Sequence, residues 1–220
     1  MPIVLQQAAE MVQRFIGGGL ANCVNVLQKR SNGLGAEKIG KLLDASQINA
    51  SLFESACHIK QLFGQIDEVI HAIGILLVLP HILFPGEEVC GLSLAAGNTG
   101  QQFDLETTHR IAEFTFISWR GGPEVIRQNK IFKDFFFLAE EPTEKHKELY
   151  VLGTEMPLKF FKSRRRLKAI LNGNAKLGSR FGEVYPHNPF TTVSDYYLVK
   201  SESVNICDIS PLLHATKSNV

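Results

Sequence analysis

The stretch FDLETTHRIAEFTFISW, residues 103–119, indicates the fold class of this chain, because its alternation is that of two adjacent β-strands. In a strand, Ile111, Glu113 and Thr115 would share one face, and the apolar residues between them would share the other. Both faces are then mainly apolar, which predicts a central strand covered on both sides. Glu113 is therefore expected to be a buried carboxylate, which needs a cation, hydrogen bonds, a metal ion or a bound proton.

The elements around this stretch predict an α/β domain preceded by a helical region. Two short helices are expected before residue 32, and a longer helical pattern runs over 50–79. Strands are expected at 88–96, 102–107 and 110–119, with a turn at 97–100, followed by a helix over 123–139 and a strand at 149–153. The order helix, three-strand meander, helix, strand is typical of an α/β sheet domain. We divide the chain into an N-terminal helical region (1–60), an α/β core (61–157) and a basic C-terminal extension packed on the core (158–220).

Composition and charge exclude several classes of protein. The chain has 220 residues, of which 45% are hydrophobic and 20% charged, so it can form a sizeable core and is not generally disordered. The formal charge of +1 gives no global attraction to nucleic acid or membrane. The apolar stretch 70–84 is too short to span a membrane and is expected to be a buried core helix.

The cysteines and the N-terminus favour a cytoplasmic protein without membrane contact. The four cysteines are widely spaced, form no Cys-x-x-Cys motif and stand in apolar contexts, which indicates buried, reduced thiols. The first residues do not have the pattern of a secretory signal. The sequence leaves the oligomeric state open, a homo-oligomer included.

One segment concentrates the basic residues. Between Lys159 and Arg180 there are eight lysines and arginines and no acidic residue, so the rest of the chain carries a formal charge of −7. Such a patch is suited to contact with a phosphate backbone, or else it is a solvated face or a docking surface for an acidic protein. The candidate nucleic-acid-binding residues are Lys159, Lys162, Arg164, Arg165, Arg166 and Lys168.

Asp104 and Glu113 form a candidate metal site. Asp104 stands at the beginning of the strand before that of Glu113, so a meander can bring the two carboxylates together. Two such oxygen ligands suit magnesium, which takes few protein carboxylates and keeps several waters. The alternative is a structural Glu113 that is satisfied by Arg110 or another basic residue.

The acid of one strand, the Glu-x-x triplet of the next and a following helix with a glutamine resemble the core of the PD-(D/E)xK nuclease superfamily, which has the restriction-endonuclease-like fold. The predicted order of elements is also similar to that core. The resemblance implies that Asp104 and Glu113 bind the metal and that Gln128 accompanies them. Because the superfamily often takes a further acid from its first core helix, it also makes Glu68 a candidate ligand.

The chain departs from the superfamily pattern at one position. Thr115 stands where the pattern has lysine, and a neutral hydroxyl cannot supply the positive charge that stabilises a phosphate under attack. On the following helix, Gln128 is expected to face the sheet with Phe132, whereas Lys130 lies about 200° around the axis. A relocated lysine is therefore not evident from the sequence.

Three functions remain open from the sequence. The leading hypothesis is a metal-dependent nuclease that hydrolyses phosphodiester bonds with magnesium, or manganese in its place, and with DNA favoured over RNA as substrate. The second is a weakened or inactive nuclease-fold protein that binds nucleic acid without cleaving it. The third is a scaffold that binds a protein partner through its N-terminal helices.

Overall fold

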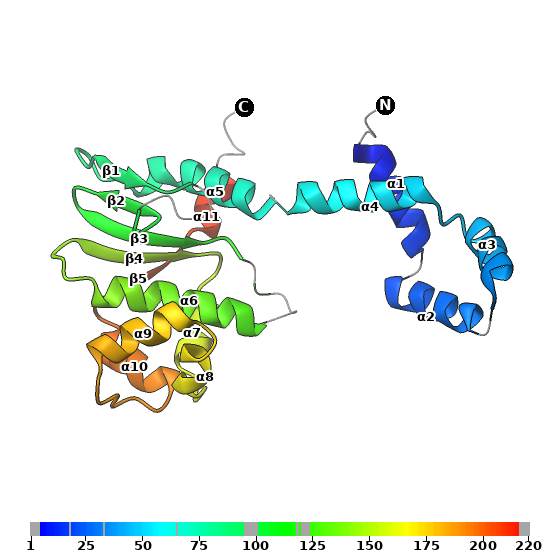
Figure 1. Cartoon of the computed structure of the whole chain (residues 1–220). Helices are drawn as coiled ribbons and strands as arrows, with labels where there is room; N and C mark the ends of the chain where they lie inside the picture. The colour runs from blue at the N-terminus through cyan, green and yellow to red at the C-terminus, as the bar shows by residue number, and fades with distance from the viewer. Residues whose placement is uncertain are drawn as a thin grey trace. The chain divides into compact units, whose positions relative to one another are not determined.

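The structure, a computed structural model, describes residues 5–17, 19–32, 34–64, 66–94, 101–117, 119 and 124–215. The chain divides into two compact units, 1–67 and 68–220, which are described separately below (Figure 1). The boundary lies at residue 67, whereas the sequence analysis placed it at residue 60. The segment 158–220 belongs to the same unit as the sheet.

The N-terminal unit consists of helices. They are α1 (Leu5–Ile16), α2 (Leu20–Ser31), α3 (Ala36–Ala45) and α4 (Ala50–Phe63). Helix α1 packs along α4, where the buried hydroxyl of Ser55 lies 3.5 Å from the sulfur of Met11. The side chain of Asn49 accepts a hydrogen bond from the amide of Leu52 and so caps α4. The two short helices expected before residue 32 are present, and α3 is an addition to them.

The second unit contains a five-stranded mixed sheet, so the predicted α/β class is confirmed. Its strands, in spatial as well as chain order, are β1 (Val89–Leu92), β2 (Leu105–Thr107), β3 (Arg110–Thr115), β4 (His146–Val151) and β5 (Asn205–Asp208). Strand β2 pairs antiparallel with both β1 and β3, whereas β4 pairs in parallel with β3 and β5 in parallel with β4. Strand β3 is central, as predicted. The turn expected at 97–100 and the end of the strand expected over 88–96 lie outside the described residues.

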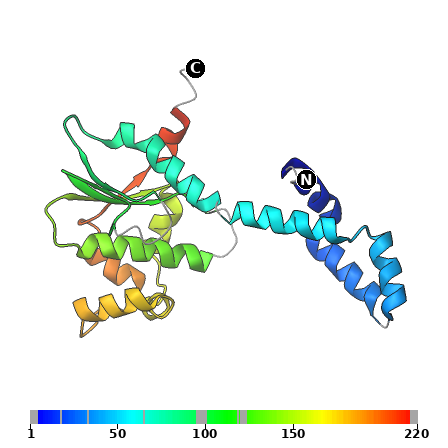
Figure 2. The same cartoon turned by 45° about the horizontal axis from the view of Figure 1, so that its top comes forward.

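Helices cover both faces of this sheet. On one face α5 (Ile66–Ile82) and α11 (Ser210–Ala215) pack over Leu105, Ala112 and Phe114 (Figure 2). On the other face lies α6 (Glu124–Glu140), and the last layer covers α6 with α7 (Glu155–Phe161), α8 (Leu167–Leu171), α9 (Ala175–Val184) and α10 (Val193–Lys200). The C-terminal extension therefore provides both a helical layer and the edge strand β5, which the sequence analysis did not predict.

Helix α5 is not the fully buried core helix that its composition suggested. Gly74, Ile75, Val78 and Leu79 are buried against the sheet, but a second apolar face is exposed. That exposed face includes Val69, Ile70, Ile73, Leu76 and Leu77. The expectation was wrong because a helix that packs on a sheet from outside covers only one of its faces.

The helical run Ala50–Ile82 is long and apolar enough, by length and composition alone, to cross a membrane. Core helices of soluble proteins pass the same test, so the absence of membrane contact stays a prediction. The four cysteines are free thiols. Cys57 and Cys90 are exposed rather than buried as expected, because α4 and the edge strand β1 each leave one face uncovered.

The guanidinium of Arg110, 2% exposed, joins the beginning of β3 to two other segments of the unit. It donates two hydrogen bonds of 2.6 Å to Glu87, in the connection between α5 and β1. It also donates to Glu148 and Tyr150 on β4, at 2.7 and 2.8 Å, and lies 4.5 Å from the ring centre of Phe84. The hydrogen bonds from Arg110 lower the pKa of Glu87 to about 2. The ion pair therefore stabilises the fold at pH values above about 4.5 and is lost as the pH falls towards 2.

We expect Arg110→Met to lower the free energy of unfolding by about 3–5 kcal/mol, because it leaves the buried carboxylate of Glu87 without its partner. Urea unfolding followed by circular dichroism measures this loss. Lys145→Met is the control, since its ion pair with Glu106 is partly exposed and is worth about 1 kcal/mol or less. A loss from Arg110→Met no larger than that of the control would contradict the role of the network.

Candidate active site

The antiparallel pairing of β2 with β3 brings the two predicted metal ligands together. Leu105 pairs with Ala112, so Asp104 and Glu113 are the next residues in register on the two strands. Oδ2 of Asp104 accepts a hydrogen bond of 2.9 Å from the amide of Phe114, which orients the carboxylate. The negative charge of Asp104 is one of the causes that raise the pKa of Glu113. The meander thus produces the juxtaposition expected from the sequence.

Helix α5 contributes a histidine to this cluster. Nε2 of His71 lies 3.3 Å from Oδ1 of Asp104. One turn further along, a Cβ atom on Gly74 would clash with the ring of Phe116, so the glycine allows α5 to approach the end of β3 closely. His71 was not singled out from the sequence, because a lone histidine in an apolar helix carries no recognisable motif.

Glu68, the predicted ligand from the first core helix, is exposed. It stands three residues before His71, on about the same side of α5. Among the described residues it makes no hydrogen bond or ion pair with Asp104 or Glu113. Its role as a metal ligand stays a prediction.

Lys130 of α6 brings a positive charge to Thr115, near the end of β3. Its Nζ lies 3.3 Å from Oγ1 of Thr115 and 2.6 Å from Oδ2 of Asp134. Asp134 is almost fully buried and also lies 3.3 Å from Nζ of Lys133. The expectation that Lys130 points away from the sheet is therefore wrong.

Gln128 has the opposite orientation to the one expected. Its side chain accepts a hydrogen bond from Arg165, in the connection between α7 and α8. The aromatic rings on the same side of α6 pack on the C-terminal helices, Phe132 against Tyr196 and Phe135 against Phe161. Helix α6 has two buried faces, and the more apolar one was taken to cover the sheet. It covers the C-terminal layer instead.

The charges of the cluster interact strongly. Burial, followed by the negative charges of Asp134 and Asp104, raises the pKa of Glu113 well above its ordinary value. Burial alone would also raise the pKa of Asp104, but the hydrogen bonds from His71 and from the amide of Phe114 outweigh it and lower this pKa. Burial would lower the pKa of Lys130, but the adjacent Asp134 raises it, so Lys130 stays positively charged.

These residues suit a hard divalent cation. Carboxylate oxygens are the ligands that magnesium prefers, and a cation would offset the negative charge that Asp104 and Glu113 add beside the Lys130–Asp134 pair. Within the described part of the chain, no group of three or more His, Cys, Asp and Glu side chains could hold a metal ion. A magnesium ion would therefore depend on Asp104 and Glu113 together with bound water.

The predicted nucleic-acid-binding residues lie on α7, on α8 and in the connection between them. Arg164, Arg165 and Arg166 are not helical, contrary to the expectation that the segment is partly a helix through these positions. Arg165 is half-buried through its bond to Gln128, and the other members of the set are exposed: Lys159, Lys162, Arg164, Arg166 and Lys168. Helix α6 begins near the ends of strands β3 and β4 (Figure 1). Gln128 in its first turns bonds to Arg165, so the basic segment is connected to the part of α6 that also carries Lys130.

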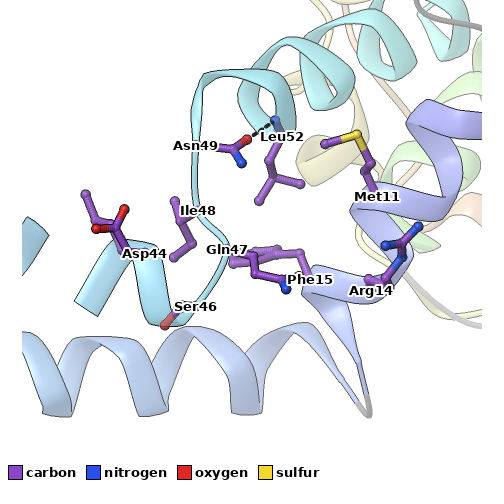
Figure 3. Close-up of a pocket in the computed structure, with 10 residues that line it drawn as sticks. Met11, Arg14, Phe15, Asp44, Ser46, Gln47, Ile48, Asn49 and Leu52 are labelled. Atoms are coloured by element: carbon purple, nitrogen blue, oxygen red, sulfur yellow. Dashed lines mark hydrogen bonds between the residues drawn. The ribbon is translucent and has the colours of Figure 1, made fainter. Parts of the chain in front are cut away.

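A pocket in the N-terminal unit is a weaker candidate. It has a volume of about 420 Å³ and lies between α1 and the segment 43–52 (Figure 3). Arg14 and Asp44 are its charged residues, and both are exposed. It lacks the buried, interacting charges of the cluster around Glu113.

Comparisons of the chain with protein-family models, curated proteins and solved structures gave no match.

We expect Glu113→Gln to remove magnesium binding and to stabilise the metal-free protein as the pH rises. A raised pKa in the folded state contributes stability below the ordinary value of 4.5, and this contribution is lost at higher pH, where the carboxyl must ionise in its buried position. The variant should therefore match the parent at pH 4 and melt at a higher temperature at pH 8.

Isothermal calorimetry with magnesium and thermal unfolding at both pH values test this prediction. Glu106→Gln, on a partly exposed residue of β2, should retain the magnesium response. Unchanged magnesium affinity in Glu113→Gln would exclude Glu113 as a ligand.

Proposed function

We propose that this chain is a metal-dependent nuclease of the PD-(D/E)xK type, with a restriction-endonuclease-like core formed by α5, β1, β2, β3, α6 and β4. The observation that carries the proposal is the contact of Lys130 with Thr115, beside Asp104 and Glu113. A lysine from α6 supplies the charge that is missing from the strand. This contact supports the proposal, because the neutral hydroxyl of Thr115 could not supply such a charge.

Each residue of the site would have a separate role in phosphodiester hydrolysis. Asp104 and Glu113 would hold the metal ion, which supplies an activated water and polarises the phosphodiester. The ammonium group of Lys130 would orient the attacking water or stabilise the negative charge that develops on the phosphate. Asp134 accepts a hydrogen bond from Lys130 and fixes its position. Gln128, turned towards Arg165, would act on the substrate backbone rather than on the metal.

The basic residues on α7, α8 and their connection support nucleic acid as the substrate. Five of them are exposed, and none of these five has an acidic side chain within ion-pair distance among the described residues. Clustered basic side chains without acidic partners favour a polyanion over an isolated small molecule. We propose DNA rather than RNA as the substrate. An inactive binding protein remains the alternative, and magnesium-dependent cleavage distinguishes the two.

Lys130→Met should reduce magnesium-dependent cleavage of DNA about 10²–10³-fold, the size of effect seen when one group that stabilises transition-state charge is removed. Adding Thr115→Lys to this variant should restore part of the activity, because it returns the charge to the strand. Cleavage of end-labelled DNA under single-turnover conditions is the measurement.

Lys133→Met is the matched control, since Lys133 is on the same helix and contacts Asp134 but not Thr115. It should retain most of the activity. Equal losses in the two lysine variants, with magnesium affinity intact, would remove Lys130 from the mechanism. If the parent cleaves DNA neither in magnesium nor in manganese, nucleic-acid binding is the only one of the two functions that remains.

The triple replacement of Lys162, Arg164 and Arg166 by alanine should weaken duplex binding for every sequence. Each phosphate contact that is lost lowers the slope of log affinity against log salt by about 0.9, so up to three such units are expected. Titrations without magnesium at several salt concentrations measure the slope. Replacing Lys29, Arg30 and Lys38 of the N-terminal unit by alanine makes the same change of charge and should leave the salt slope unaltered. An unchanged slope in the first variant would exclude this surface as the binding site.

A further inference from the structure

Two neighbouring aliphatic side chains are exposed at the beginning of α6. Val125 is 52% exposed and Ile126 is 68% exposed, on a helix whose later turns are buried between the sheet and the C-terminal helices. Single exposed apolar side chains are common on protein surfaces. The position of this pair is informative, because Ile126 shares a face of α6 with Lys130 and Val125 shares a face with Gln128.

Helical spacing determines these two faces. Ile126 stands four residues before Lys130 and so lies one turn away on the same face of α6. Val125 stands three residues before Gln128, which bonds to Arg165 in the basic connection between α7 and α8. The aliphatic pair therefore lies one turn before Gln128 and Lys130, on the two faces of α6 that carry the bond to the basic connection and the candidate catalytic lysine.

We infer that Val125 and Ile126 form an apolar wedge that enters the base stack of a double-stranded nucleic acid. This inference rests on the proposed function and adds the form of the substrate. The basic side chains would hold the phosphates, whereas aliphatic groups gain nothing from phosphate and match the apolar surface of bases. A nucleic acid presents charged phosphates and apolar bases close enough together for neighbouring residues of a protein to contact both.

The chemistry of the pair favours a duplex over a single strand. Proteins that bind single strands usually stack the bases on exposed aromatic rings. Among the described residues near the basic connection, the partly exposed ring of Trp119 packs against Phe160, and the phenylalanines are buried: Phe132, Phe135, Phe136, Phe160 and Phe161. Aliphatic wedges, in contrast, separate adjacent base pairs of a duplex and bend it, which brings more backbone against the protein.

The test is the double variant Val125→Ser/Ile126→Ser, with a duplex that carries 2-aminopurine at its centre and no divalent cation present. The parent should increase the 2-aminopurine fluorescence on binding, because the base loses its stacking. The variant should lose this increase and bind the duplex at least about tenfold more weakly, as expected for the loss of two aliphatic contacts.

Val24→Ser/Val26→Ser on α2 is the matched control, because these aliphatic residues are 46% and 45% exposed and belong to the N-terminal unit. It should bind and unstack the duplex as the parent does. Both variants should melt at the temperature of the parent, since the replaced side chains are exposed.

The outcomes separate this inference from the proposed function. If the Val125/Ile126 variant retains the affinity and the fluorescence increase of the parent, the wedge is excluded, whether or not the protein cleaves DNA. An equal loss of affinity for the duplex and for the corresponding single strand would also overturn the assignment to a duplex. Loss of unstacking in this variant alone would support the wedge, even if the parent does not cleave in magnesium.

Discussion

The buried ion network of Arg110 fixes the position of β3, and the candidate site depends on that strand. Arg110 bonds to the connection that follows α5 and to two residues of β4, so it fastens β3 to elements on both sides of it. Once the beginning of β3 is fixed, each residue of β3 has a defined pairing partner on the neighbouring strands. At the other end of β3, Glu113 therefore lies beside Asp104, and Thr115 contacts Lys130 of α6. The stabilising network and the charged cluster occupy opposite ends of one strand.

Helix α6 is the second element on which the site depends, because it is buried on two sides. Towards the sheet it presents the Lys130–Asp134 pair, and towards the C-terminal helices it presents a series of phenylalanines. The aromatic packing prevents the helix from rotating, so Lys130 stays in contact with Thr115. The C-terminal layer thus contributes to the site without supplying one of its central groups.

The cluster around Glu113 is destabilising in the absence of a cation. Three acids, Asp104, Glu113 and Asp134, lie here with two lysines and His71. Burial, followed by the charges of the two other acids, raises the pKa of Glu113. The Arg110 network also contains two acids, Glu87 and Glu148, but there the guanidinium bonds directly to both, and the pKa of Glu87 falls. An excess of buried negative charge costs stability and is typical of sites that bind a cation or perform proton transfer. This contrast supports a functional rather than a structural reading of Asp104 and Glu113.

The sequence alone determined the α/β class, the central position of β3 and the proximity of Asp104 to Glu113. These features follow from local alternation and from short turns, which act over a few residues. The tertiary structure decided the orientation of α6, the contribution of His71 and the place of β5. A helix with two apolar faces has no local signal for which face meets the sheet, so Lys130 could not be assigned from periodicity. The answer depended on residues 155–200, which are distant in sequence and cover the aromatic face of α6.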